Sequence, residues 1–306
     1  MTSASTLGAD HPMLSDEEIE KLMKAGSILR SVRGEVAPLV AEGVNIAEIC
    51  EAVEGKIRKL GGEPAFPCNV GIDSVAAHYT SPPGEVGTVP AGALVKVDIG
   101  AHVDGYVADT AITVSTGSIY EDMIRVAEEA LERGLQSVTV GGKIADVGTA
   151  VERVIKGRGF KPISNLTGHQ VSRYTIHAGV SIPNVTGGLV SGRFEPWSVY
   201  ALEPFVTLPD AKGFVTNGQP GNILHIVKLK GPKDTASRGF FREAFRRYRT
   251  LPFAKRWVAG MGDGWRGLLD QRILYEYPVL AEASGRPVAQ AEHTVVTTEK
   301  EVLVST

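Results

Sequence analysis

Apolar positions along the chain follow two periods, one helical and one strand-like. Ser15-Asp16-Glu17-Glu18 forms a capping box with an acidic first turn, and the apolar residues that follow fall on one helical face. The pattern predicts helices at about 15–29, 45–60, 120–135 and 144–156, and strands at 66–71, 94–102, 107–115, near 181, 200–206, 223–228, 279–280 and 288–297. The order helix, helix, strands occurs twice, so we expect an α+β fold with two similar halves around one site.

The charged residues are unevenly distributed along the chain, although its overall formal charge is only −3. From Ile226 to Arg272, twelve Lys or Arg residues stand against four acidic residues, a net charge of +8 that leaves −11 for the remainder. Within 235–249, aromatic side chains at helical spacing alternate with arginines. We expect a small basic helical subdomain at 228–272, inserted into a body formed by 14–227 and 273–306, and a flexible tail at 1–13.

Composition narrows the class of protein. With 306 residues, 43 % of them hydrophobic, the chain is long enough to bury a sizeable core without disulfides. No apolar run reaches the roughly 18 residues of a membrane span, and the first residues lack the basic and apolar regions of a signal peptide. We therefore expect a cytoplasmic protein without a membrane partner, in which Cys50 and Cys68 are buried free thiols.

Two aspartates in a predicted hairpin are the first candidates for chemistry. Asp104-Gly105 between apolar runs favours a two-residue primed turn. With this loop Asp98 faces Ala111, and Asp109 lies one diagonal step away on the same face. Two carboxylates within roughly 8 Å in apolar strands raise each other's pKa unless a cation lies between them. The alternative is that one aspartate faces solvent at a strand end.

Other polar residues stand in or beside apolar runs. His169 follows a glycine, and His177 comes eight residues later, but each alone fits a hydrogen-bonded structural role. Glu203 and Glu292 lie within predicted strands that contain no Lys or Arg to pair with them. A buried, unpaired glutamate is costly, so each of them requires a partner.

If the four carboxylates and His169 share one site, they account for one another's burial. Four carboxylates carry a charge of −4, which two divalent ions neutralise. An oxygen-rich set with one imidazole favours manganese, iron, cobalt or zinc in a site more open than tetrahedral zinc, and two ions roughly 3 to 4 Å apart activate a water for hydrolysis. The candidate ligands are Asp98, Asp109, His169, Glu203 and Glu292.

Seven ordered motifs closely resemble those of the methionine aminopeptidases, metallopeptidases of the pita-bread fold. The 88 residues between Glu203 and Glu292, which include the basic insert, are similar to the type II enzymes, and the short N-terminal region is similar to the archaeal form. The motifs are Ala77-His78-Tyr79-Thr80, Val97-Asp98-Ile99-Gly100, Ala108-Asp109-Thr110, Asn165-Leu166-Thr167-Gly168-His169, Ile176-His177-Ala178-Gly179, Leu202-Glu203-Pro204-Phe205 and Glu292-His293-Thr294. The resemblance implies a curved antiparallel sheet covered by helices in pseudo-two-fold halves, with a winged-helix-like insert.

The resemblance also implies a role for each metal ligand. Asp98 chelates one ion, and His169 with Glu203 completes the other. Asp109 and Glu292 bridge both ions. The ions would be two divalent cations of cobalt, manganese, iron or zinc.

The same resemblance implies a substrate side to the site. His78 and His177 would bind the scissile amide and its developing oxyanion, and Phe66 would line the pocket for a methionine side chain. Glu203 would carry a proton to the leaving amine. The expected reaction is removal of the initiator methionine from nascent proteins and peptides with a small second residue, by a monomeric enzyme. His225 matches no motif securely, and we expect it to be structural.

Two rival functions remain. A proline dipeptidase or aminopeptidase P uses the same ligand types, but such proteins usually carry a separate N-terminal domain, and about 14 residues precede the first predicted helix here. A noncatalytic relative that binds RNA or ribosomes should have lost ligands, whereas all five are present. The basic insert itself either docks on ribosomal RNA or is a solvated helix face packed over Phe241 and Phe245.

Overall fold

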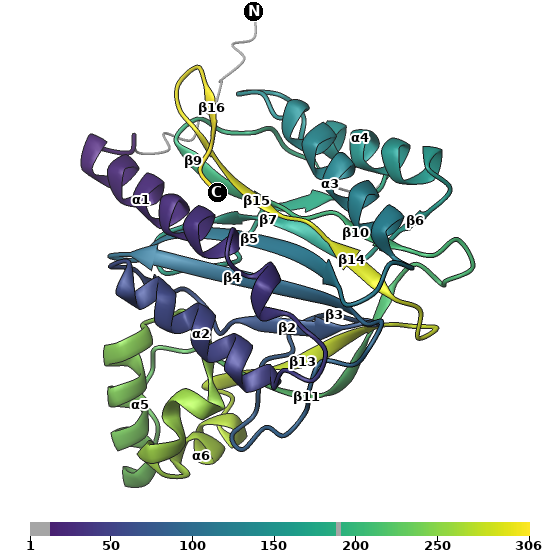
Figure 1. Ribbon diagram of the computed structural model, residues 1–306. Helices are drawn as coiled ribbons and strands as arrows, with labels where there is room; N and C mark the ends of the chain where they lie inside the picture. Colours follow the sequence, from purple (N-terminus) through teal and green to yellow (C-terminus); the bar gives the residue numbers. More distant parts are fainter. Residues whose placement is uncertain (1–12, 188–190) are drawn as a thin grey trace, which may run out of the picture.

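The computed structural model describes residues 13–187 and 191–306, so nearly all of the expected tail at 1–13 lies outside the described residues. Helices line the outside of a set of curved strands (Figure 1). The helices are α1 (Asp16–Arg33), α2 (Ile46–Lys59), α3 (Glu121–Gln136), α4 (Ile144–Gly157), α5 (Thr235–Tyr248) and α6 (Gly264–Asp270), with 3₁₀ helices η1 (Ala37–Leu39) and η2 (Lys255–Met261).

Every strand pair in the described part of the chain is antiparallel, and the strands form four sheets. One contains β1 (Glu63–Pro64), β2 (Asn69–Ile72), β4 (Leu94–Val103) and β5 (Tyr106–Ser115). A second contains β7 (Thr167–Val171), β8 (Ser181–Pro183), β9 (Ser198–Leu202), β15 (His293–Thr297) and β16 (Val302–Val304). The others contain β3 (Val75–Ala77), β11 (Val215–Ile226), β12 (Phe253–Ala254) and β13 (Leu274–Glu282), and β6 (Lys161–Pro162), β10 (Phe205–Thr207) and β14 (Val288–Gln290).

The two expected halves are present as two helix pairs on two sheets. The helices α1 and α2 pack on the sheet of β4 and β5, with Leu29, Ile49 and Val97 in a shared core. The helices α3 and α4 pack on β9 and its neighbours, with a core that includes Val151 and Leu202. Each helix buries an apolar stripe, as the helical period of the sequence predicts.

Local signals set the register of the predicted hairpin. Asp104 and Gly105 have φ angles of 52° and 87°, the left-handed values that a type I′ turn requires. The turn pairs Asp98 with Ala111 and Gly100 with Asp109 across β4 and β5. The predicted register is therefore confirmed, and both aspartates point to the same face of the sheet.

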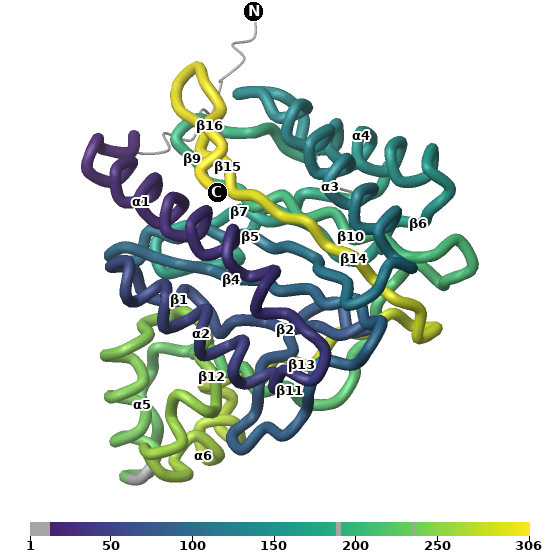
Figure 2. Tube along the Cα trace, in the orientation of Figure 1, coloured from purple at the N-terminus to yellow at the C-terminus, as the bar shows by residue number. Residues whose placement is uncertain are grey.

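The two ends of the basic segment lie side by side, because Ile226 at the end of β11 and Leu274 at the start of β13 are Cα partners. Within the segment, β12 pairs with β11 and so belongs to the same sheet. Its helix α5 lies beside α2, where Arg247 and Arg58 line one cavity, and α6 packs against α5 (Figure 2). Its apolar side chains, among them Phe240, Val258 and Leu268, share one core with Leu224 of β11 and Leu274 of β13. The helix predicted at 235–249 corresponds to α5.

Some strands are longer than the apolar pattern predicts. The strand β11 begins at Val215 rather than near 223, since its first half contains Gly218 and Pro220 and is mostly exposed. Its register with β13 shifts on both sides of Pro220.

Within the described ranges, no helix combines the length and apolar character needed to cross a membrane. A cytoplasmic location stays a prediction from the sequence.

Candidate metal centre

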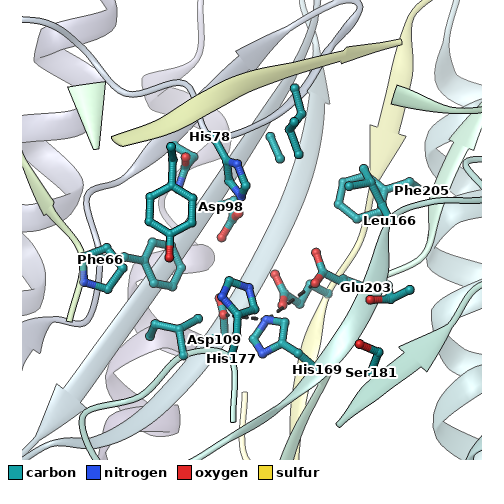
Figure 3. A pocket seen from close by; sticks show the side chains of 18 of the residues that line it. Phe66, His78, Asp98, Asp109, Leu166, His169, His177, Ser181, Glu203 and Phe205 are labelled. Atoms are coloured by element: carbon teal, nitrogen blue, oxygen red, sulfur yellow. Dashed lines mark ion pairs between the residues drawn. The ribbon is translucent and has the colours of Figure 1, made fainter. Parts of the chain in front are cut away.

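Five polar side chains from separate parts of the fold line one cavity of about 320 Å³ (Figure 3). Three stand on strands β4, β5 and β7, one directly follows β9, and one directly precedes β15. These side chains are the five predicted ligands Asp98, Asp109, His169, Glu203 and Glu292. The structure thus brings together every candidate ligand, although 194 residues separate the first from the last.

Distances among these side chains are those of a shared binding site. One ligand atom each from Asp109, His169 and Glu292 lie within 4.8 Å of one another. Nε2 of His169 is 3.7 Å from Oδ2 of Asp109 and 3.6 Å from Oε1 of Glu203. Asp98 lines the same cavity from β4.

Backbone contacts explain why the late glutamate meets the early aspartates. Glu292 forms an isolated antiparallel bridge with Ala111, the partner of Asp98. The Thr110 hydroxyl donates to the Glu292 carbonyl oxygen at 2.7 Å. The two halves of the fold are therefore joined beside the carboxylates, which fixes their spacing.

Burial sets the protonation of these groups. It raises the pKa of the Asp98 carboxyl to about 7. Burial and neighbouring carboxylates raise the pKa well above its usual value in each of Asp109, Glu203 and Glu292. Burial lowers the pKa of His169 to about 3, so its imidazole is neutral at pH 7 and has a free lone pair.

The donor set fits divalent cations. Oδ1 of Asp98, Oδ1 of Asp109 and Oε1 of Glu292 are buried and have no hydrogen-bond partner among the described residues. Buried carboxylate oxygens are normally paired or coordinated, since an isolated charge in the interior is strongly unfavourable. Four carboxylates supply hard oxygen donors, and one neutral imidazole supplies a nitrogen donor. This donor set suits manganese, iron, cobalt and zinc, the metals predicted from the sequence.

The predicted substrate-side residues lie around the same cavity. His177 packs edge to face on His169 with ring centroids 4.5 Å apart, and His78 lies across the cavity (Figure 3). Phe66 forms one wall. Its ring occupies the space that a Cβ at residue 100 would fill, because such an atom would lie 2.2 Å from the Phe66 ring. Gly100 is therefore required for this wall.

Three cavity-side residues were missed by the sequence analysis. Asn69 and Tyr277 line the cavity, and Nε2 of Gln290 lies 3.3 Å from Oε2 of Glu203. Gln290 is two residues before Glu292, so strand alternation could have placed it on the same face. His225 lies outside the cavity lining, and its ring stacks on Tyr277 with centroids 6.0 Å apart.

Comparison with known proteins gives one consistent family. Residues 20–299 match the model for metallopeptidase family M24. The methionine aminopeptidase of Thermococcus onnurineus is 40 % identical over 296 residues, covering 95 % of this chain and all of that protein. The methionine aminopeptidase of Saccharolobus solfataricus is 38 % identical over 305 residues, covering 96 % of this chain and 99 % of that protein.

Solved structures agree on the fold. A thermophilic Arx1 has a TM-score of 0.82 at 18 % identity, covering 95 % of this chain and 91 % of that chain. The methionine aminopeptidase of Thermotoga maritima has a TM-score of 0.68 at 21 % identity, covering 96 % of this chain and 98 % of that chain. The predicted pita-bread architecture is therefore confirmed.

Proposed function

The chain belongs to metallopeptidase family M24, and we propose that its cavity removes the N-terminal methionine from peptides and nascent proteins. The relatives that match nearly its whole length are named methionine aminopeptidases, which favours this activity over Xaa-Pro cleavage. The observation that carries the proposal is the convergence of four carboxylates and three histidines on one cavity beside Phe66. The reaction is a metal-dependent hydrolysis.

Five residues hold the metal in this proposal. Asp98 would hold one divalent ion, and His169 and Glu203 would hold a second. Asp109 and Glu292 would serve both ions, and each has a buried oxygen atom without a hydrogen-bond partner among the described residues. When bound, the ions lower the pKa of water and polarise the scissile carbonyl. Their number and identity, among cobalt, manganese, iron and zinc, are part of the proposal.

The chain's own groups bind and orient the peptide. Phe66 contacts the methionine side chain, and His78 and His177 bind the scissile amide and the oxygen that becomes negative. Burial and the nearby His177 lower the pKa of His78 to about 4, so this ring is neutral at pH 7 and donates a hydrogen bond from one nitrogen.

Proton transfer completes the cleavage. Water adds to the carbonyl carbon, the C–N bond breaks, and the leaving nitrogen takes a proton. Burial and the nearby Asp98 raise the pKa of the Glu203 carboxyl in the metal-free fold, and a bound cation would favour its ionised form, which can accept a proton. We assign it to accept the water proton and to deliver it to the leaving amine.

Two peptides separate this function from its nearest rival. We expect the protein, loaded with manganese or cobalt, to release free methionine from a Met-Gly peptide and not to prefer a matched Xaa-Pro peptide. The control is the same assay after metal is removed by a chelator. Absence of metal-dependent methionine release would contradict the proposal, and faster cleavage of the Xaa-Pro peptide would favour the rival.

Metal content tests the number and identity of the ions. Protein purified without added metal should bind two equivalents of the activating cation, and each candidate metal is titrated into the metal-free protein. Binding of a single equivalent at full activity would contradict the dinuclear assignment.

A further proposal concerns residues 228–272, which we assign as a distinct basic unit that contacts ribosomal RNA. It is supported by basic side chains exposed on and before α5, among them Lys228, Lys230 and Arg242. Ribosome co-sedimentation should weaken between low and high salt, and a Lys228→Glu/Lys230→Glu/Arg242→Glu variant should bind less. Salt-independent binding would contradict an electrostatic contact. The monomeric state stays a prediction that light scattering would test.

A further inference from the structure

The basic segment reaches the body through a buried ion pair. Arg256 in η2 contacts Glu54 in α2, and their side chains are 9 % and 3 % exposed. Nε1 of Trp257 donates to the second oxygen of the same carboxylate at 2.8 Å. Two neighbouring residues of the segment therefore meet one carboxylate of the body.

From this pair, hydrogen bonds lead to the backbone of Cys68. The Cys68 N–H donates to Oε1 of Glu54 at 3.0 Å. The Arg256 guanidinium donates to Oγ1 of Thr80 at 2.7 Å, and the Thr80 hydroxyl donates to the Cys68 carbonyl at 2.7 Å. Thr80 and Cys68 are 0 % and 1 % exposed, so water does not compete for these bonds.

The residues held in this way carry the substrate side of the cavity. Phe66 is two residues before Cys68, and His78 is two residues before Thr80. The two segments are also joined by the Val70 N–H, which donates to the Tyr79 carbonyl at 2.8 Å. His78 has a φ of 65°, a conformation that a residue with a side chain keeps only where its surroundings enforce it.

We propose that Arg256 is a positioning residue for methionine cleavage, which acts from the basic segment through Glu54 and Thr80 on Phe66 and His78. This inference rests on the proposed function, because that function gives Phe66 and His78 their roles. Misplacement of such groups by about 1 Å lowers turnover on the order of 100-fold. The segment would then contribute to the chemistry without touching the substrate.

The alternative is that the pair only fastens the segment to the body. In that case, weakening it lowers the stability of the fold but leaves the kinetic constants of the folded protein unchanged. The two readings therefore differ in kcat/KM and in selectivity measured on protein that is folded and metal-loaded.

Thr80 offers a matched pair of variants. Thr80→Val keeps the shape and removes the hydroxyl that joins Arg256 to Cys68, whereas Thr80→Ser retains it. We expect Thr80→Val to lower kcat/KM for a Met-Gly peptide roughly 10- to 100-fold at unchanged metal content, and Thr80→Ser to stay within about threefold of wild type.

Arg256→Lys is a second test that leaves a charge opposite Glu54. A lysine cannot reach both Glu54 and Thr80 as the guanidinium does, so we expect a similar loss. Thr80→Val and Arg256→Lys interrupt the same series of hydrogen bonds. The Thr80→Val/Arg256→Lys double variant should therefore have a kcat/KM no lower than that of the more impaired single variant. The control is Arg246→Met, at an exposed residue of α5 that pairs with Glu243; it should leave kcat/KM unchanged.

The selectivity of the variants distinguishes a displaced Phe66 side chain from a general loss of activity. The ratio of kcat/KM for N-terminal methionine over N-terminal alanine should fall at least about threefold in Thr80→Val and Arg256→Lys. If wild type releases methionine and both variants match it, the positioning role is wrong while the proposed function stands. The positioning role is also wrong if the loss of kcat/KM parallels a loss of bound metal. It is wrong as well if Thr80→Ser loses as much kcat/KM as Thr80→Val. If wild type releases no methionine with any metal, the proposed function fails, and the positioning role fails with it.

Discussion

His169 and His177 pack edge to face, with ring centroids 4.5 Å apart, yet they face different parts of the cavity. His169 is buried among the carboxylates, whereas His177 is exposed. In the proposed function, the two rings therefore separate the side that binds metal from the side that binds substrate. Substitutions on the two sides should have different effects.

On the substrate side, His177→Ala should lower kcat for methionine release by roughly 10²- to 10³-fold while bound metal is retained, because a donor to the developing oxyanion is lost. The measurement is steady-state kinetics with metal content determined on the same sample. Loss of metal in this variant would place His177 among the ligands instead.

On the metal side, Asp109→Ala should lower turnover on the order of 10³-fold or more and reduce bound metal, since it removes a residue proposed to bind both ions. Calorimetric titration of manganese into the metal-free variant checks the binding. Normal activity in this variant would show that the metal assignment is wrong.

The buried Asp98 carboxyl should make the metal-free protein less stable as pH rises towards 7. Its pKa is about 7 in the fold against about 3.9 in an unfolded chain, so its contribution to stability is complete below about pH 4 and is lost as pH rises through 7. Histidines titrate over the same range, so the effect is measured as the difference in unfolding free energy between wild type and Asp98→Asn, which should fall by up to about 1.4 kcal/mol per pH unit between pH 5 and 7.

Denaturant unfolding of metal-free wild type and Asp98→Asn at pH 5 and 7 tests this expectation. Added manganese should remove the decline in the wild type, because it binds the ionised carboxylates. A difference between wild type and Asp98→Asn that stays constant or grows between pH 5 and 7 would contradict the raised pKa of Asp98.

Gly100→Ala tests the wall formed by Phe66. The added Cβ would lie 2.2 Å from the ring, so the ring must move, with a cost of about 1–3 kcal/mol in unfolding free energy. Cleavage after methionine should fall more than cleavage after alanine. Gly55→Ala is the matched control, because no atom lies within 4 Å of the new Cβ and the residue is in helix α2.

The buried pair should behave as one unit in unfolding experiments. Arg256→Met leaves the Glu54 charge buried without its cation and should cost about 3–5 kcal/mol. The Glu54→Gln/Arg256→Met double variant should cost less than the sum of its single variants, which chemical denaturation measures. Simple additivity would mean that the two side chains do not interact.

The candidate site was accessible from the sequence because its signals are local. A two-residue Asp-Gly turn fixes the hairpin register, so the relative placement of Asp98 and Asp109 follows from counting. Glu203 and Glu292 could also be identified from their local sequence, because a glutamate within an apolar strand is costly to bury without a partner.

Other features depend on distant contacts. Glu54 and Arg256 are separated by 202 residues, and each lies on an ordinary helical segment. Asn69 and Tyr277 are unremarkable within a strand, and the fold alone places them at the cavity. The first half of β11 was not predicted, because Gly218 and Pro220 interrupt the strand pattern. In the structure, pairing with β13 holds this half in the sheet.

The attachment of the basic segment has a mechanical consequence. Its two ends meet at the Ile226–Leu274 pair, and its strand β12 pairs with β11, so these backbone attachments all lie along one strand of the sheet. The Arg256–Glu54 contact adds an attachment on a different element, helix α2, which restrains rotation of the segment about that strand. A force exerted on the segment by anything bound to it is therefore transmitted to α2 and to the Cys68 backbone as well as to the sheet.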